Sequence, residues 1–580
     1  MNSRWAAELG ERVCAFALVF LLGGGVALGS PKVTTKAQAG ASGGAQQPKV
    51  PMAPVNVPPS QQTIPTVAAP PLPPVMTMMG PMTGTKEACE GLRSLKIEDT
   101  AIEAAGVVDT PRFNVPNSTA VYRNLPRFCR VVGVTRPAIR FEVWLPMEHW
   151  SGRYEVVGNG GMAGVVNYSS LAGGLRRGNA TASTNTGHAN LPGEGFDASW
   201  SMDKPELVED FGHRALHLTT VNGKRLTREF YGRPAKHSIY VGCSKGGGQG
   251  LMEAERYPND FDGIVAGDPA YNWTHLYAGA HLYYSQAVLK DPESYIQPAK
   301  VKILADAVNR ACDGKDGFAD GVVNDPFSCK VDLSQIACKE GEDVGGCFTP
   351  KQIEVVKKIW AGSKEENGKQ FFPGLLPGGE GGANGWQAWV TGSAPYHGTH
   401  WRAADSFFRY MVMGDESYDA LDFDYNREHD RKMLDRLAPM LNADDADLRP
   451  FMKRGGKLIL YHGLSDPDIS AVNTINFYQR VTEIVGPQTP GFARLFLAPG
   501  MQHCGGGPGP DAFDAVAAIQ RWVDEGTAPE KIVASHYTEG VLDRSRPLCP
   551  YPQMAVYSGK GNAVEASSWV CKVSGGLAKK

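Results

Sequence analysis

Residues 237–256, HSIYVGCSKGGGQGLMEAER, carry the sequence signal that decides the fold. A run rich in β-branched and aromatic residues leads into Gly242-Cys243-Ser244-Lys245-Gly246, and a helical pattern that begins in glycines follows. These residues fit G-x-S-x-G, and a strand, a sharp turn and a helix are the setting that exposes such a serine at the tip of a sheet. Flanking glycines let the turn form without side-chain clashes. The stretch predicts an α/β-hydrolase fold with Ser244 as nucleophile; the alternative is a glycine-rich turn with a solvated serine.

The same rhythm of strands and helices extends outward from this stretch. Between Phe141 and Ala270, strand-like runs (FEVWLP, RYEVV, HSIYVG, FDGIVAG) alternate with glycine turns and helical segments, which indicates a parallel sheet. The pattern lapses from Tyr271 to Asp447. It resumes at KLILYHG (457–463), ARLFLAPG (493–500) and the helical stretch DAFDAVAAIQRWVDEG (511–526). We expect one α/β core, residues 89–270 and 448–580, interrupted by a large insertion at 271–447.

The first 88 residues have the character of a leader and a linker. Residues 13–29 carry no charge, follow two arginines and end in small residues, so residues 1–29 are expected to be a secretory signal peptide. The alternative is an uncleaved anchor. Residues 46–82 are crowded with proline, and residues 30–88 are expected to form an extended linker. We therefore expect a secreted or periplasmic protein without stable membrane association.

The composition of the chain indicates which binding partners and which cysteine chemistry to expect. The chain has 58 Lys and Arg against 61 Asp and Glu, a net charge of −3, and no basic stripe, so nucleic acid is not an expected partner. With Cys14 in the leader, ten of the 11 cysteines remain, and an even number in an exported chain favours five disulfides. The alternative is buried free thiols in a cytosolic protein. The sequence does not indicate the oligomeric state.

Two loops after late strands offer partners for Ser244. A serine hydroxyl is a poor nucleophile at neutral pH and needs a histidine base that a carboxylate orients. In this fold the chain order is Ser, then Asp or Glu, then His. Asp466 follows KLILYHG, and His503 follows ARLFLAPG. We expect Ser244, Asp466 and His503 to form a catalytic triad.

Cysteines flank two members of this triad. Cys243 precedes Ser244, and Cys504 follows His503. A disulfide between them would hold their Cα atoms about 4.4–6.8 Å apart, and each adjacent residue adds at most about 3.8 Å. Such a bridge would keep the serine and the histidine within reach of a hydrogen bond. In the alternative, each cysteine pairs elsewhere.

The oxyanion of an acyl-transfer reaction needs two backbone donors. The N–H of Lys245, directly after the nucleophile, is one candidate. The glycine-rich loop Gly158-Asn159-Gly160-Gly161 after RYEVV offers the other, and we favour Gly161. No G-x-G-x-x-G pattern fits this loop, so it does not indicate dinucleotide binding.

An acidic loop lies inside the insertion. Asp313, Asp316 and Asp320 fall within eight residues. Carboxylates at such short separations repel one another unless a cation binds them. Oxygen ligands at this density suit Ca²⁺, with backbone carbonyls or water completing the shell. The spacing is not that of an EF-hand. We expect a structural calcium ion; the alternative is a pair of solvated Asp-Gly turns.

The chain resembles the tannase and feruloyl esterase family, which also includes the mono(2-hydroxyethyl) terephthalate hydrolases. The resemblance rests on GCSKGG (242–247), YHGLSD (461–466) and PGMQHC (499–504) and extends from about Cys89 to the C-terminus. It implies a secreted serine esterase with an α/β-hydrolase core and a lid domain, here 271–447, that carries calcium.

Carried over to this sequence, the resemblance gives Ser244, Asp466 and His503 the roles of nucleophile, acid and base, and it makes Gly161 and Lys245 the oxyanion hole. The implied calcium ligands are the carboxylates of Asp313, Asp316 and Asp320 and the carbonyls of Phe318 and Val322. The implied disulfides are Cys89–Cys129, Cys243–Cys504, Cys312–Cys329, Cys338–Cys347 and Cys549–Cys571.

The resemblance says less about the substrate. His462, beside the triad, and the lid aromatics are candidates to hold an aromatic acid, namely Trp386, Trp389, Trp401, Phe407 and Phe408, of which we favour Trp389 and Phe407. A terephthalate monoester requires an arginine to bind its free carboxylate. The candidates for this arginine are Arg402 and Arg409. We expect hydrolysis of feruloyl, galloyl or similar phenolic esters through an acyl-enzyme. The alternatives are terephthalate monoester hydrolysis and a catalytically silent binding module.

Overall fold

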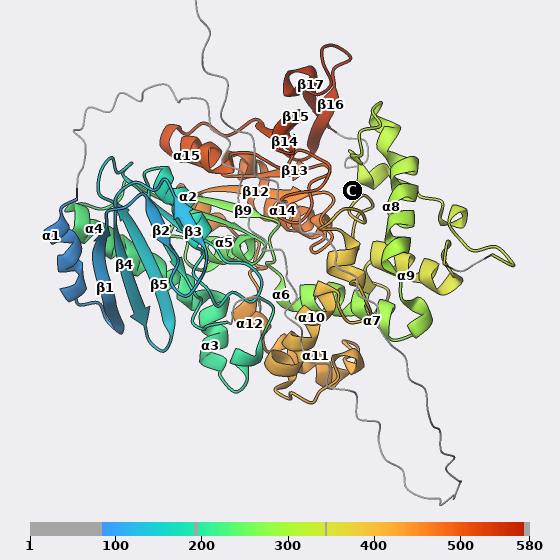
Figure 1. Ribbon diagram of the computed structural model, residues 1–580, viewed down its shortest axis with the longest axis horizontal. Helices are drawn as coiled ribbons and strands as arrows, with labels where there is room; N and C mark the ends of the chain where they lie inside the picture. The colour runs from blue at the N-terminus through green and yellow to red at the C-terminus, as the bar shows by residue number, and fades with distance from the viewer. Residues whose placement is uncertain (1–83, 191–194, 343–344, 574–580) are drawn as a thin grey trace, which may run out of the picture. The chain divides into compact units, whose positions relative to one another are not determined.

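The computed structural model describes residues 84–190, 195–342 and 345–573. A nine-stranded sheet lies at its centre, with strand order β1-β4-β5-β7-β6-β8-β9-β12-β13 (Figure 1). The strands from β7 to β13 in this order run parallel: β7 (Ala180–Thr184), β6 (Arg153–Val157), β8 (His237–Cys243), β9 (Gly263–Gly267), β12 (Lys457–Gly463) and β13 (Ala493–Ala498). The fold is that of an α/β-hydrolase.

The other edge of the sheet is antiparallel. It consists of β1 (Thr100–Val108), β4 (Phe128–Thr135) and β5 (Ile139–Pro146). The prediction that FEVWLP belongs to a parallel sheet is wrong, because this run lies in β5, which pairs antiparallel with both β4 and β7. The short turn between β4 and β5 leaves no room for a crossover, and such a turn joins only antiparallel strands.

Both faces of the parallel strands are buried, which explains their nearly continuous apolar sequence. Tyr240, Ile264 and Leu458 face one side, where α4 (Ala215–Tyr231), α5 (Lys245–Arg256) and α14 (Ala471–Val485) pack. The neighbouring residues Ile239 and Val265 face the other side. That side is covered by α15 (Ala515–Glu525) and, further along, by α2 (Tyr168–Arg176).

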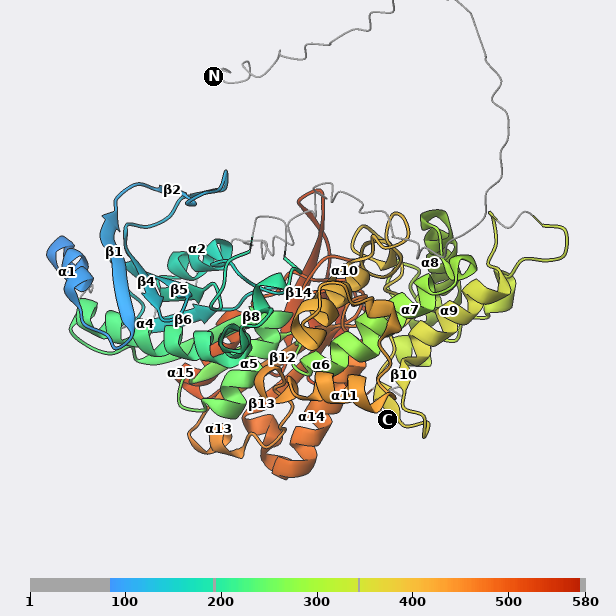
Figure 2. The same ribbon diagram turned by 90° about the horizontal axis from the view of Figure 1, so that it is seen from below.

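The insertion leaves the sheet at the carboxyl end of β9 and returns at β12, its direct neighbour. Since β8 ends at the same edge, the inserted segment starts close to Ser244. Figure 2 shows three of its helices, α6, α7 and α10, gathered together. The helices and strands of the insertion are α6 (Trp273–Leu276), α7 (Tyr283–Leu289), α8 (Pro298–Cys312), α9 (Pro350–Ala361), β10 (Ser363–Lys364), β11 (Gln370–Phe372), α10 (Thr399–Ser406), α11 (Glu428–Asp435) and α12 (Ala438–Leu441).

The last part of the described chain adds no strand to the central sheet. After α15 the chain forms two separate hairpins, β14 (Ile532–Thr538) with β15 (Val541–Leu548) and β16 (Gln553–Tyr557) with β17 (Trp569–Val573). Neither joins the central sheet. The remaining short elements are α1 (Lys86–Gly91), β2 (Arg112–Asn114), β3 (Val121–Arg123), α3 (Pro205–Glu209) and α13 (Arg449–Lys453).

The expected signal peptide and most of the expected linker lie outside the described residues. Within the described ranges, no helix combines the length and the apolar character that crossing a membrane requires.

Candidate active site

Ser244 occupies the sharp turn between β8 and α5. Its backbone is left-handed, with φ 63° and ψ −125°, an unusual conformation for a residue with a side chain. Its N–H donates to the carbonyl of Gly267 at 3.0 Å. A Cβ on Gly247 would lie 2.1 Å from the Gly267 carbonyl oxygen, so only glycine allows α5 to start this close to β9. The glycines after the serine therefore fix the turn against the end of the next strand.

Asp466 and His503 are hydrogen-bonded on the two loops that follow β12 and β13. His503 Nδ1 lies 2.8 Å from Asp466 Oδ2. The other carboxylate oxygen of Asp466 accepts the N–H groups of Asp468, at 2.8 Å, and Ile469, at 3.0 Å. With both oxygens engaged, the buried carboxylate has a fixed orientation, and it holds the imidazole by one nitrogen.

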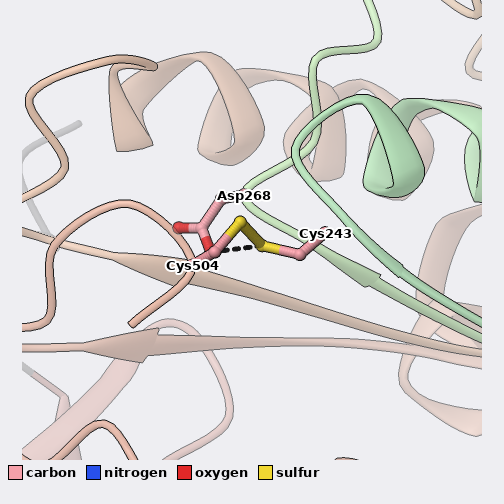
Figure 3. A group of neighbouring side chains, drawn as sticks. All are labelled: Cys243, Asp268 and Cys504. Carbon is pink, nitrogen blue, oxygen red and sulfur yellow. Dashed lines mark hydrogen bonds between the residues drawn. A yellow bond between two sulfur atoms is a disulfide. The ribbon is translucent and has the colours of Figure 1, made fainter. Parts of the chain in front are cut away.

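A disulfide between Cys243 and Cys504 joins the serine turn to the histidine loop. Figure 3 shows this bridge beside Asp268, whose Oδ2 lies 3.2 Å from the Cys243 sulfur. The two cysteines are 261 residues apart in sequence, and their Cα atoms are 6.0 Å apart. Because Ser244 and His503 are the adjacent residues, the bridge keeps their backbones close.

The expected hydrogen bond between Ser244 and His503 is not formed. Within the described part of the chain, the Ser244 hydroxyl has no hydrogen bond to the imidazole, and His503 Nε2 lies 3.4 Å from Asp468 Oδ2 instead. In enzymes without bound substrate such catalytic contacts are often long. The disulfide brings the two residues together, whereas the local carboxylates set the direction of the ring.

Two carboxylates dominate the electrostatics of His503. Burial lowers the pKa of an imidazole, but here the charges of Asp466 and Asp468 outweigh it and raise the pKa of His503 to about 10. The side chain is only 8% exposed, so water screens these charges weakly. The arrangement favours the imidazolium form.

His462 lies behind the triad rather than on an accessible surface. It is fully buried, and its ring nitrogens lie 2.8 Å from Thr474 Oγ1 and 3.0 Å from the carbonyl of Ile469. Its Nε2 is also 3.2 Å from Asp466 Oδ2. This differs from the expected substrate contact: both nitrogens already have partners inside the protein, and the histidine supports Asp466.

The glycine-rich loop after β6 packs directly on the serine turn. The N–H of Gly158 donates to the Val241 carbonyl at 2.9 Å, and a Cβ on Gly246 would lie 3.0 Å from the Asn159 carbonyl oxygen. Gly161 has φ 53° and leaves no room for a side chain against the Gly195 carbonyl. The two loops that carry the expected oxyanion donors, Gly161 and Lys245, therefore meet.

The side chain of Lys245 points into an aromatic environment. Its Nζ lies 3.9 Å from the ring centre of Phe211 and 4.8 Å from that of Trp273, and the residue is 3% exposed. Burial lowers the pKa of this lysine to about 7. Only the backbone N–H of Lys245 remains as the expected contribution to the site.

The two favoured lid aromatics differ in position. The Trp389 ring stands edge-on to the His503 ring, with centres 5.2 Å apart. Phe407 is fully buried between Tyr277 and Phe408 in the core of the insertion. Its apolar ring supports the insertion, so the expectation of a substrate contact at Phe407 is corrected.

Of the two arginines considered for a substrate carboxylate, Arg409 already has partners within the insertion. Arg409 Nε donates to Asp405 at 2.7 Å, and its Nη1 donates to the carbonyl of Glu416 at 2.9 Å. Arg402, on α10, is half-buried. Arg409 is thus engaged by the lid itself.

The acidic loop of the insertion is closed by the Cys312–Cys329 disulfide. Asp313 accepts the N–H groups of Asp320, at 3.1 Å, and Gly321, at 3.0 Å. Burial and the charges of Asp320 and Asp313 raise the pKa of Asp316. A cavity of about 10 Å³ borders Asp316 and Val322, but Arg546 and mostly apolar residues complete its lining, so it is not the ion site itself. The loop thus gathers carboxylate oxygens, the kind of ligand that Ca²⁺ takes in proteins.

Arginines from β15 reach the same loop. Arg546 lies 2.9 Å from Asp320 Oδ2, and Arg544 lies 3.5 Å from the same oxygen. They supply part of the positive charge that the carboxylates require. The structure also contains three further disulfides, Cys89–Cys129, Cys338–Cys347 and Cys549–Cys571.

The sequence reasoning missed the acidic residues around the triad. Asp268 follows β9, and Asp468 stands two positions after Asp466. Both have the signal that identified Asp466, a carboxylate directly after a buried parallel strand. His281 and His400, which lie against Asp468, carry no comparable local signal.

The fold and the strained serine turn define an α/β-hydrolase, and comparison with known proteins identifies its family. The family model described as tannase and feruloyl esterase matches residues 120–572. The chain belongs to this family and is a carboxylic ester hydrolase.

Several relatives match along most of their length. The chain is 37% identical over 530 residues to an uncharacterised esterase of Xanthomonas campestris, covering 83% of this chain and 91% of the relative. It is 34% identical over 485 residues to a probable feruloyl esterase B-1 of Aspergillus flavus, covering 80% and 89%. A crystal structure of an esterase from Aspergillus oryzae superimposes with a TM-score of 0.76 at 32% identity, covering 84% of this chain and all of that one. Feruloyl esterase B of the same organism gives a TM-score of 0.75 at 28% identity, covering 84% and 100%.

Proposed function

We propose that this protein is a secreted serine esterase that hydrolyses esters of aromatic carboxylic acids through an acyl-enzyme. The observation that carries the proposal is the Ser244 turn, tied by the Cys243–Cys504 disulfide to a histidine that Asp466 holds at 2.8 Å. Other features of the chain support the proposed steps and the proposed substrate.

In the proposed reaction Ser244 Oγ attacks the ester carbonyl while His503 takes its proton. The N–H groups of Gly161 and Lys245 stabilise the oxyanion that forms. His503 then gives the proton to the departing alcohol, and a water molecule, deprotonated by the same histidine, releases the acid and restores Ser244. Asp466 stabilises the imidazolium formed in both steps.

An aromatic acid is the favoured acyl group. Relatives at 34% and 28% identity are named feruloyl esterases. Trp389 supports the same substrate class, because its ring stands beside His503 and offers an edge or a face to an aromatic ring. The engaged Arg409 counts against a terephthalate monoester as the preferred substrate.

The acidic loop is proposed to hold a structural calcium ion through Asp313, Asp316 and Asp320 and the carbonyls of Phe318 and Val322. When bound, the ion would neutralise the carboxylates and fix the loop against β15. Export is proposed from the leader-like N-terminus and from five disulfides, which persist in oxidising compartments.

A panel of hydroxycinnamate, gallate and terephthalate esters tests the substrate proposal with the purified protein. We expect the highest kcat/KM for a hydroxycinnamate or gallate ester. Preference for the terephthalate monoester would contradict it. Labelling with a fluorophosphonate, followed by peptide mapping, separates an active serine enzyme from a silent binding protein: the label is expected on Ser244.

A further inference from the structure

A buried carboxylate that the proposed reaction does not use lies among three histidines. Asp468, 4% exposed, accepts from His281 Nε2 at 2.8 Å and lies 3.3 Å from His400 Nε2. Its other oxygen lies 3.4 Å from His503 Nε2. His281 and His400 are also buried, at 2% and 0% exposure. The carboxylate of Asp468 therefore has these histidines, and not water, as its main partners.

The position of Asp468 relative to the catalytic ring is specific. Asp466 holds His503 by Nδ1, and Asp468, two residues later, faces Nε2 of the same ring. Nε2 is the nitrogen that must accept the serine proton. A charged carboxylate there stabilises a proton on Nε2 and competes with the Ser244 hydroxyl for the ring.

We propose that Asp468 is a positioning residue that sets the protonation and the direction of His503, and that the lid histidines His281 and His400 hold Asp468 in place. The inference rests on the proposed function, since it assigns Asp468 a role in the same serine chemistry. It makes the working pH of the catalytic base depend on the contact between lid and core.

The charges around His503 support this assignment. From the core loops, Asp466, Asp468 and Asp268 act on the ring, and His462 lies against Asp466. From the lid, Trp389 contributes an uncharged ring.

Both lid histidines lie against one carboxylate oxygen of Asp468, and His503 Nε2 faces the other oxygen. Burial and the neighbouring His281 lower the pKa of His400 to about 4, so His400 is uncharged near neutral pH. The negative charge of Asp468 therefore acts on His503 and His281 more than on His400.

Both lid histidines reach Asp468 from helical segments of the insertion. His281 lies in the π-helical turn Tyr277–Leu282 that precedes α7, and His400 lies in α10. Their rings are nearly parallel, with centres 4.5 Å apart. The ring nitrogens of His400 and the Nδ1 of His281 have no hydrogen-bond partner among the described residues. His281 is thus oriented by its hydrogen bond to Asp468, and His400 by packing against His281 and by the nearby carboxylate.

The test follows the rate at which a neutral fluorophosphonate labels Ser244 as a function of pH, in the wild type and in Asp468→Asn. Labelling needs the unprotonated base but no particular ester. We expect the acid limb of Asp468→Asn to move at least one pH unit lower, which is a tenfold or larger gain at acidic pH relative to its own plateau. An unchanged limb, or one that moves to higher pH, would overturn the proposal.

Asp260→Asn is the matched control. Asp260 is also buried and also pairs with a histidine, His217, at 2.7 Å, but it lies at the amino end of β9, away from the triad edge of the sheet. We expect its acid limb to match that of the wild type. A shift equal to that of Asp468→Asn would overturn the specific role of Asp468.

Two further measurements keep the test decisive. If Asp468→Asn does not fold, Asp468→Glu, which keeps the charge, is expected to retain a limb within half a unit of the wild type, and a limb one unit lower would refute the proposal. In the wild type the limb must lie above the ordinary histidine value of about 6.5; a limb at or below it also refutes the proposal.

If Ser244 labels but no aromatic ester is cleaved, only the substrate proposal fails, and the limb shift still decides the role of Asp468.

Discussion

Two groups of aspartates in this protein each lie next to a disulfide. The two groups differ in the sequence span of that disulfide and in the cations that pair with the carboxylates. Asp466 and Asp468 meet His503 beside a bridge that spans 261 residues, whereas the acidic loop around Asp316 is closed by a bridge that spans 17. The first group is neutralised by histidines and the second, in part, by Arg544 and Arg546.

The two groups differ in the kind of cation that balances their carboxylates. Histidine gains or loses its charge near neutral pH, whereas arginine stays charged. The triad group should therefore respond to pH and depend on long-range folding. The acidic loop should respond to metal ions and depend on local structure.

Replacing Ser244 should remove the activity of the triad group without affecting the stability of the protein. Ser244→Ala is expected to lower kcat by about 10⁴-fold or more, because no other group at the turn can form the acyl-enzyme. The melting temperature should stay nearly unchanged, since the side chain is small and half-buried. Steady-state kinetics on an aromatic ester checks this, with Ser334→Ala in the lid as control. Activity that survives in Ser244→Ala would contradict the site.

Removing the Cys243–Cys504 disulfide and removing the Cys312–Cys329 disulfide should have different effects on activity. Cys243→Ser with Cys504→Ser is expected to lower kcat/KM by about 10- to 100-fold even where the protein is folded, because the covalent link between serine turn and histidine loop is lost. Cys312→Ser with Cys329→Ser should leave kcat/KM within about twofold and cost about 3 kcal/mol of stability, the scale for a short loop. Kinetics and thermal unfolding of both double variants check this. Equal losses of activity would break the contrast.

The pH dependence of the wild type should come from the triad group. His503 acts as a base only when neutral, and its raised pKa keeps it protonated at neutral pH. The expected kcat/KM therefore rises about tenfold per pH unit below that pKa and levels off above it. A profile measured with an uncharged ester over the range in which the protein stays folded checks this. A flat profile from pH 5 to 8 would contradict it.

Metal removal should affect the acidic loop and spare the chemistry. EDTA is expected to lower the melting temperature by several degrees, because binding of an ion to the folded state adds to its stability. At temperatures where the protein stays folded, kcat should change less than twofold. Asp313→Asn should lose the EDTA effect, and excess Ca²⁺ but not Mg²⁺ should restore the wild type. A melting curve that EDTA leaves unchanged would argue against a metal in this loop.

Local patterns were enough to locate the central elements of the site. The strand, turn and helix around Ser244, and the loops of Asp466 and His503, could be located because adjacent residues dictate a buried strand and the loop that follows it. The direction of β5 could not, since an apolar run reads the same in parallel and antiparallel pairs. The burial of Phe407 was also invisible, because an aromatic residue at a helical position packs in a core or lines a pocket with the same sequence.

The sequence alone determined the class of fold and located the residues of the proposed triad and the acidic loop, because each depends on residues close together in the chain. The tertiary structure decided which nitrogen of His503 faces which carboxylate and which charges compensate the acidic loop. His281 and Asp468 meet across 187 residues and Arg546 and Asp320 across 226. Such contacts depend on how the lid, the core and the C-terminal hairpins pack, and local sequence does not encode that packing.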